Sequence, residues 1–125
     1  MEQEVALHFR DQLRAARSAA LRDAEAFQEI VFVLERLGAF LSNDRRNLGT
    51  YLPRIKDQAA RSPMAEEVPK ELPHFHQQFE VKYEIVREAR NAALHEGAIA
   101  RHLTVNAVEL SLILEEGIMS ELHQV

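Results

Sequence analysis

Apolar residues recur along this chain three and four positions apart, and they almost nowhere alternate with polar residues. This spacing places them on one face of an α-helix, whereas alternation would indicate a half-buried strand. Short connections between such segments make consecutive helices neighbours. The pattern therefore predicts an all-α fold, an antiparallel bundle of four to five helices. The expected helical segments are Glu4–Arg22, Asp23–Leu41, Thr50–Arg61, Phe75–His95 and Thr104–Leu122.

Three of these segments carry a recognisable stripe of core residues. In the first segment the stripe is Val5, Phe9, Leu13, Ala16 and Ala20. In the fourth it is Phe75, Phe79, Tyr83, Val86, Ala89 and Ala93. In the last it is Val105, Val108, Leu112 and Ile118, joined by Leu110, Ile113 and Leu114. The second segment is apolar on more than one side, so we expect it to be the most deeply buried.

The boundaries in the first half of the chain are signalled unevenly. Asp23 could cap the second helix, but the residues around it would equally sustain one long, bent helix. The sequence 42–44, Ser-Asn-Asp, predicts a turn. Pro53 is tolerable only in the first turn of the helix that follows. Three prolines between Ser62 and His74 predict an extended surface connection.

In the second half, two residues are expected to mark the ends of helices. Gly97 is a plausible C-cap for the fourth helix, because glycine adopts the left-handed conformation that often ends a helix. Thr104 is expected to cap the last helix, and Leu103 with Val108 has the spacing of a hydrophobic staple. The residues between these two caps would then form a turn.

Length and composition indicate one globular helical-bundle domain spanning residues 1–125, with 46% hydrophobic residues. The absence of cysteine excludes disulfides, thiolate nucleophiles and cysteine-zinc sites, and it suits a cytoplasmic protein. No signal peptide and no membrane anchor are recognisable. The net charge of -5 opposes nonspecific attraction to phosphate. Any RNA binding would therefore require a local basic surface.

The segment from Arg90 to His95, Arg-Asn-Ala-Ala-Leu-His, is the part of the chain that points to chemistry. Arg87, Asn91 and His95 are four residues apart on the expected helix and share a stripe, with Arg90 about 100° from Asn91. An arginine followed directly by an asparagine and five positions later by a histidine, as in Arg90, Asn91 and His95, is expected only roughly 0.02 times by chance in a chain with twelve arginines, six histidines and four asparagines. Asn91 can orient the imidazole, and the helix C-terminus favours its protonated form.

These groups meet the requirements of metal-free RNA cleavage. A base removes the proton of the ribose 2′-OH, a cation stabilises the charged phosphorane, and an acid protonates the leaving 5′ oxygen. Arg90 would supply the cation and His95 the base or acid, with Asn91 orienting the pair. One histidine can hardly serve both ends of an in-line displacement, whereas two copies facing each other across a two-fold axis can. The mechanism predicts a homodimer with a composite site and requires no metal or cofactor.

The Arg-Asn-x3-His pattern near the end of a helix in a small bundle resembles the Arg-x4-6-His motif of the HEPN superfamily (higher eukaryotes and prokaryotes nucleotide-binding). The resemblance implies a HEPN-like bundle and a dimeric, metal-independent endoribonuclease, in a toxin–antitoxin or antiviral defence setting. It gives Arg90 and His95 the catalytic roles, and Asn91 matches the polar residue that commonly follows the arginine. It also implies a possible antitoxin or fused regulatory domain as a partner. Where one toxin branch has a modifiable tyrosine two residues after the histidine, this chain has Gly97.

Arg87, Arg101 and His102 are further candidates for RNA binding. Arg87 shares the stripe of Asn91, while Gly97 would allow the chain to fold back and bring Arg101 and His102 towards the motif. An alternative function is a noncatalytic HEPN-like module that uses the same groove to dimerise or to bind a nucleotide or RNA. A third is a purely structural bundle in which Arg90 is paired internally.

Several charged groups also have plainer structural explanations. Arg90 could form an ion pair with Glu88 or Glu116. The arginines that flank the core stripe of the first helix are interpreted as a solvated face in preference to an RNA contact; they are Arg10, Arg14, Arg17 and Arg22. A metal site is not predicted at His74, His76, His95 and His102, because Glu80 is the one acidic residue three or four positions after any of them, and His74 and His76 lie in the proline-rich segment.

Overall fold

A computed structural model describes residues 1–23, 26–61, 79–90 and 97–123 of the chain. The described residues form five helices and no strand: α1 (Gln3–Arg22), α2 (Phe27–Ser42), α3 (Leu48–Ala59), α6 (Phe79–Arg90) and α7 (Gly97–His123). The predicted all-α bundle is confirmed.

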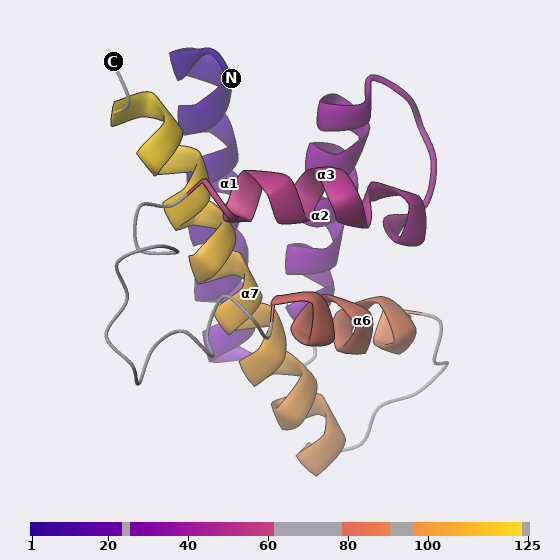
Figure 1. Cartoon of the computed structure of the whole chain (residues 1–125). Coiled ribbons are helices and arrows are strands. Elements are labelled where there is room, and N and C mark those ends of the chain that lie inside the picture. Colours follow the sequence, from indigo (N-terminus) through magenta and orange to yellow (C-terminus); the bar gives the residue numbers. More distant parts are fainter. Residues whose placement is uncertain (24–25, 62–78, 91–96, 124–125) are drawn as a thin grey trace, which may run out of the picture.

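The helices lie in two crossed groups (Figure 1). Helix α1 runs antiparallel both to α2 and to the long α7, and it packs against each of them. Helices α3 and α6 lie crosswise in front of these three, and both contact α2 and α7. The start of α3 and the end of α6 lie on the same side of the molecule, although they are far apart in the sequence.

The core confirms the stripes predicted for two helices. In α1, Phe9, Leu13, Ala16 and Ala20 are buried, and Val5 packs partly buried against them. In α6 the buried apolar residues are Phe79, Tyr83, Val86 and Ala89. Phe75 and Ala93 lie outside the described residues. These two helices are amphipathic, so their sequences specify which face turns inward.

For α2 the prediction of burial on several sides is only partly correct. Seven of its residues are buried: Phe27, Ile30, Val31, Val33, Leu34, Leu37 and Gly38. Phe32 and Phe40, however, remain 40% and 47% exposed. The ring of Phe40 lies at the edge of the contact with α1, 5.6 Å from the ring of Phe9 between centroids, and Phe32 lines a surface cleft.

The predicted inner face of α7 is wrong at two positions. Val105 and Leu112 were expected in the core, but they are 55% and 44% exposed. The buried face is instead centred on Leu103, Ala107, Leu110, Leu114 and Ile118, with Ile113 beside it. Because α7 carries apolar residues on nearly all sides, its sequence alone does not select the face that α1, α3 and α6 cover.

Two predicted boundaries near α7 are also wrong. Gly97 begins α7 and does not end the preceding helix. Thr104 lies inside α7 and is buried, so it is not an N-cap. Good capping residues had suggested a turn there, but tertiary packing around the segment overrides that local preference. Arg101 and His102 consequently lie on a helix and not in a turn.

The break between α1 and α2 falls at Asp23. Its backbone is extended, and its N–H donates to the carbonyl of Ala19, so the residue closes α1. Helix α3 begins two residues earlier than predicted, because Asn47 caps it by accepting a hydrogen bond from the Thr50 N–H at 3.0 Å. Pro53 therefore lies in the second turn, where it has no N–H to donate to the carbonyl of Gly49.

Glu121 near the end of α7 joins three parts of the chain. Its carboxylate accepts hydrogen bonds from the Met1 amino group at 2.7 Å, the Gln58 amide at 2.7 Å and the Arg61 guanidinium at 2.6 Å. Burial by itself raises the pKa of Glu121, but these hydrogen bonds and the positive charges outweigh it and hold the pKa below its usual value.

Acid should therefore destabilise the fold partly through Glu121. Because its pKa is lower in the folded than in the unfolded chain, its stabilisation is present above the unfolded value, about 4.3, and is lost as the pH falls through the folded value. We expect Glu121→Gln to lower the free energy of unfolding by about 1–2 kcal/mol at pH 7 and much less near pH 3. Urea unfolding at both pH values measures this; a difference that does not shrink in acid would contradict it.

Candidate functional site

The predicted catalytic segment begins where α6 ends. Arg90 is the last residue of α6, and Asn91 and His95 lie outside the described residues. Of the predicted stripe, Arg87 is described with its side chain. The environment of Arg87 therefore provides the view of the candidate site that the structure offers.

Arg87 lies over the first turn of α3. Its guanidinium donates to the carboxylate of Glu84, with Nε and Nη2 at 2.9 Å and 2.6 Å from the same oxygen. This hydrogen bond, and next the charge of the carboxylate, raise the pKa of Arg87, so it stays cationic. The absence of a side chain at Gly49 provides room for it, since a Cβ there would lie 3.3 Å from Nη1 of Arg87.

A cleft of about 750 Å³ opens beside Arg87 and contains three more arginines. They are Arg36 from α2, and Arg45 and Arg46 from the connection between α2 and α3. The remaining lining residues are Phe32, Glu35, Ala39, Asn47, Leu48, Gly49 and Tyr51. Four guanidinium groups face one carboxylate among the lining residues, although the whole chain is negatively charged. This set is named the arginine cleft below, and it is a local basic surface of the kind that RNA binding would require.

Tyr51 of α3 holds the connection that carries Arg45 and Arg46. Its hydroxyl accepts a hydrogen bond from the Arg46 N–H and donates to the carbonyl of Asp44 at 3.2 Å. The ring packs on Gly38 of α2, where a Cβ would lie only 2.4 Å from ring carbons. One buried phenol therefore fixes the backbone on which both arginines stand.

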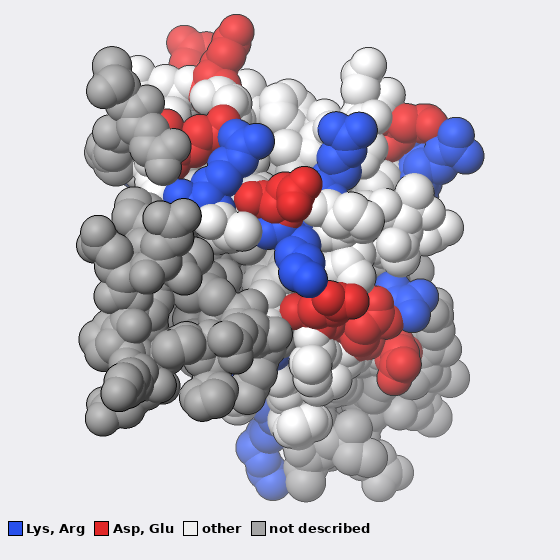
Figure 2. Space-filling model, viewed as in Figure 1, with Lys and Arg blue, Asp and Glu red and all other residues white. Residues whose placement is uncertain are grey.

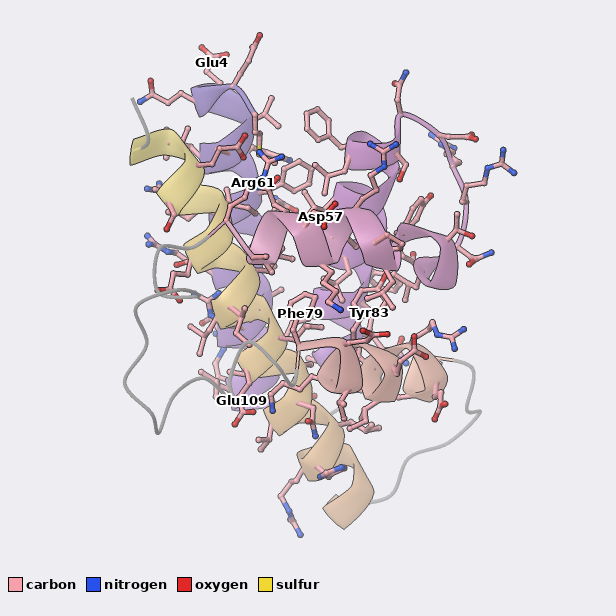
Figure 3. The ribbon with its side chains drawn as sticks, viewed as in Figure 1. Glu4, Asp57, Arg61, Phe79, Tyr83 and Glu109 are labelled. Atoms are coloured by element: carbon pink, nitrogen blue, oxygen red, sulfur yellow. The ribbon has the colours of Figure 1, made fainter. Side chains whose placement is uncertain are left out.

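Tyr83 holds α6 against the same end of α3. Its buried hydroxyl donates to the carbonyl of Leu48 at 2.5 Å, and its ring and that of Phe79 lie between the two helices (Figure 3). Burial, and then the nearby carboxylate of Glu84, raise the pKa of Tyr83, so the phenol remains a donor. Because Arg87 follows one turn after Tyr83, this hydrogen bond sets the height of Arg87 over α3.

The four arginines differ in how firmly they are held. Arg36 donates to the side chain of Gln12 at 2.8 Å, and Arg46 forms an exposed ion pair with Asp44 at 2.7 Å. Arg45 makes no ion pair with any described residue. Exposed pairs of this kind are worth about 1 kcal/mol or less, so an incoming anion can replace them at small cost.

The structure does not bring Arg101 and His102 into the arginine cleft. Both are exposed in the first turns of α7, and neither lines the cleft. The side-chain amide of Asn106 donates to the carbonyl of His102 at 2.9 Å. Their assignment to RNA binding therefore gains no support from the cleft.

The arginines of α1 are engaged in ion pairs. Arg14 and Arg17 both reach Glu115 of α7, at 3.2 Å and 2.8 Å, and Arg10 pairs with Asp11. Figure 2 shows other basic and acidic side chains that lie beside one another on the visible face. Arg14 and Arg17 therefore join α1 to α7, which agrees with the structural interpretation of the stripe.

Comparison with known proteins adds no identification. No family model, no curated protein and no solved structure matches this chain. Within the described segments, no cluster of three or more metal-ligating side chains is found. None of the described helices combines the length and the apolar character needed to cross a membrane.

Sequence reasoning named Arg87 but missed Arg36, Arg45 and Arg46. The sequence contained one signal for two of them. The pair Arg45-Arg46 directly follows the predicted Ser-Asn-Asp turn, and a turn places adjacent residues at the surface. Their proximity to Arg87 could not be read from the sequence, because it depends on α6 crossing the start of α3.

Proposed function

We propose that this chain is a metal-independent endoribonuclease of HEPN type that acts as a homodimer. In this proposal, His95 serves as general base or acid, Arg90 stabilises the negative charge of the phosphorane, and Asn91 orients the pair. The subunits together supply the two imidazoles that an in-line displacement requires. An antitoxin or a regulatory domain remains a possible partner, and the cytoplasm the expected location.

The observation that supports this proposal is the arginine cleft beside α6. Arg87 lines the cleft, and Arg90 follows it by three residues on the same helix, about one turn away. Arginines bind phosphate through paired N–H groups, so a strand held in the cleft would pass the end of α6 where the catalytic segment begins. Even with the carboxylates of Asp44 and Glu84, which pair with Arg46 and Arg87, and that of Glu35, the four arginines outnumber the three acidic groups at the cleft.

The same observation also suits the alternative, a noncatalytic module that binds RNA or a nucleotide. The carboxylate of Glu84 holds Arg87 in place. A guanidinium held in this way can bind a phosphate group without taking part in cleavage. The two functions share the cleft and differ in whether bound RNA is cut.

The nature of the RNA products tests the catalytic proposal. Purified protein is incubated with a mixture of single-stranded RNAs in the presence of EDTA, and the new ends are analysed by mass spectrometry. We expect cleavage with 2′,3′-cyclic phosphate ends, because the nucleophile is the neighbouring 2′-OH. Bound but intact RNA would instead favour the noncatalytic module, and RNA neither bound nor cut would leave a structural bundle.

The homodimer is tested by sedimentation at micromolar concentration, where the composite site predicts a mass twice that of one chain. A monomer that still cleaves RNA would remove the composite site, since one imidazole would then be sufficient.

A further inference from the structure

We infer that the arginine cleft binds one nucleotide unit of a single RNA strand, with its phosphates on Arg45, Arg46 and Arg87 and its base against the ring of Phe32. The inference takes RNA as the ligand from the proposed function. It adds a subsite formed by α2 and the connection between α2 and α3, which the sequence did not indicate.

The backbone at Arg46 and the side chain of Arg87 are positioned before any ligand binds. Tyr51 clamps the backbone around Arg46, and Glu84 with Gly49 sets the position of Arg87. The start of α3 lies among these side chains, and the N-terminal end of a helix carries a partial positive charge. An anion would therefore meet three guanidinium groups and a favourable dipole, once it replaces the exposed ion pair between Arg46 and Asp44.

The base side is provided by Phe32. Its side chain lines the cleft and is 40% exposed, so the ring is accessible to a ligand. Phe32 and Arg36 are four residues apart on α2, so the ring and a cation are neighbours on one helix face. Aromatic rings beside a basic groove are the arrangement by which proteins hold unpaired bases, because every base can stack on a ring.

One other exposed phenylalanine, Phe40, lines a pocket with Arg54 and Arg61, but the carboxylates of Asp57 and Glu121 line the same pocket and balance these two arginines. Val81, Val105 and Leu112 are exposed on α6 and α7, but the described structure places no arginine cluster and no aromatic ring with them. A base buried within a duplex cannot stack on Phe32, so the subsite fits an unpaired strand and not a helix of RNA.

Binding to a strand that cannot be cut tests the inference. A short, fluorescently labelled 2′-O-methyl oligonucleotide lacks the nucleophilic 2′-OH, and an abasic oligonucleotide of the same length keeps the phosphates without the bases. Fluorescence anisotropy gives the Kd of each for the full chain and for Phe32→Ala, for the double variant Arg45→Ala/Arg46→Ala, and for Arg54→Ala. Arg54 is exposed on α3 and lines a different pocket, so it is the matched control for loss of charge.

Phe32→Ala should weaken binding of the base-containing strand about 5- to 20-fold and leave the abasic strand unchanged. The double arginine variant should weaken both strands and reduce the slope of log Kd against log salt by about 1.4, the value for two lost contacts to a single strand. Circular dichroism and thermal unfolding check that each variant remains folded.

The inference is overturned if Phe32→Ala weakens both strands equally or neither, or if Arg54→Ala weakens binding as much as the double variant. Equal weakening by Arg54→Ala and by the double arginine variant would indicate that the protein binds any polyanion through its charge alone. The proposed function fails separately: binding that follows the expected pattern while natural RNA stays intact removes the nuclease and keeps the subsite. Cleavage that none of the cleft variants alters removes the subsite and keeps the nuclease.

Discussion

Replacing His95 by alanine is expected to lower the rate of RNA cleavage by about 10²- to 10⁴-fold, the usual contribution of a positioned acid or base. Replacing Arg90 by alanine should cost about 10²- to 10³-fold, because the phosphorane would lose its stabilising cation. Single-turnover rates with enzyme in excess over RNA, and at saturation, separate the chemical step from binding. Under those conditions neither substitution should change the Kd by a comparable factor.

Two matched substitutions serve as controls for these effects. His8 is exposed on α1 and Arg54 on α3, and neither lines the arginine cleft, so His8→Ala and Arg54→Ala should cleave at the rate of the unmodified chain. The pH dependence provides a second criterion. If one imidazole acts as base and another as acid, the rate should be bell-shaped around pH 6.5, the usual pKa of histidine. Cleavage by His95→Ala at the full rate would disprove the assignment.

Gly117→Ala is expected to have the largest effect on stability of any single methyl group added to the described core. Gly117 lies where α7 crosses the end of α3, and a Cβ there would come within 2.2 Å of the Gln58 carbonyl oxygen and 2.7 Å of the Ala59 Cα. Both are backbone atoms, so no side chain can rotate away and the two helices must separate. Alanine is favoured over glycine within a helix by about 1 kcal/mol, but overpacking of this kind costs more.

The expected net loss for Gly117→Ala is about 2–3 kcal/mol of unfolding free energy, which corresponds to a Tm roughly 10 °C lower. Gly49→Ala is the matched control, because the same substitution there would meet only the ends of the Asn47 and Arg87 side chains, at 3.2 Å and 3.3 Å. These side chains can shift, so the Tm of Gly49→Ala should change by no more than a few degrees. Similar losses for both variants would show that helix separation is not the cause.

Part of the fold follows directly from the spacing of apolar residues. In α1 and α6 one face is apolar and the other charged, so Leu13, Tyr83 and their neighbours could be placed in the core from the sequence. In α7 apolar residues occur on nearly every side, and the inner face was assigned incorrectly at Val105 and Leu112. A periodic pattern specifies a buried face only when it also specifies an exposed one.

The boundaries of the helices were less predictable than their existence. Thr104 has the character of an N-cap and Gly97 that of a C-cap, yet both lie within α7. Capping preferences are worth about 1 kcal/mol each, and burial of Leu103 and Ala107 against neighbouring helices exceeds that. Local signals therefore yielded to packing wherever the two disagreed.

For the candidate site, the sequence identified residues that are neighbours along one helix. Arg87, Arg90, Asn91 and His95 are close in sequence, and helical geometry alone suggested that they act together. Arg36, Arg45 and Arg46 were not associated with them, because they come from α2 and the connection after it. Their association with Arg87 depends on the hydrogen bond from Tyr83 to Leu48.

The amino-acid sequence by itself determined that the chain is helical, which sides of α1 and α6 are buried, and where a candidate catalytic segment lies. These properties depend on residues within a few turns of one another. The tertiary structure alone decided which side of α7 is covered, why a glycine is needed at position 117, and that four arginines surround one cleft. Such properties depend on helices that cross far from each other in the sequence, and no local pattern encodes where two helices touch.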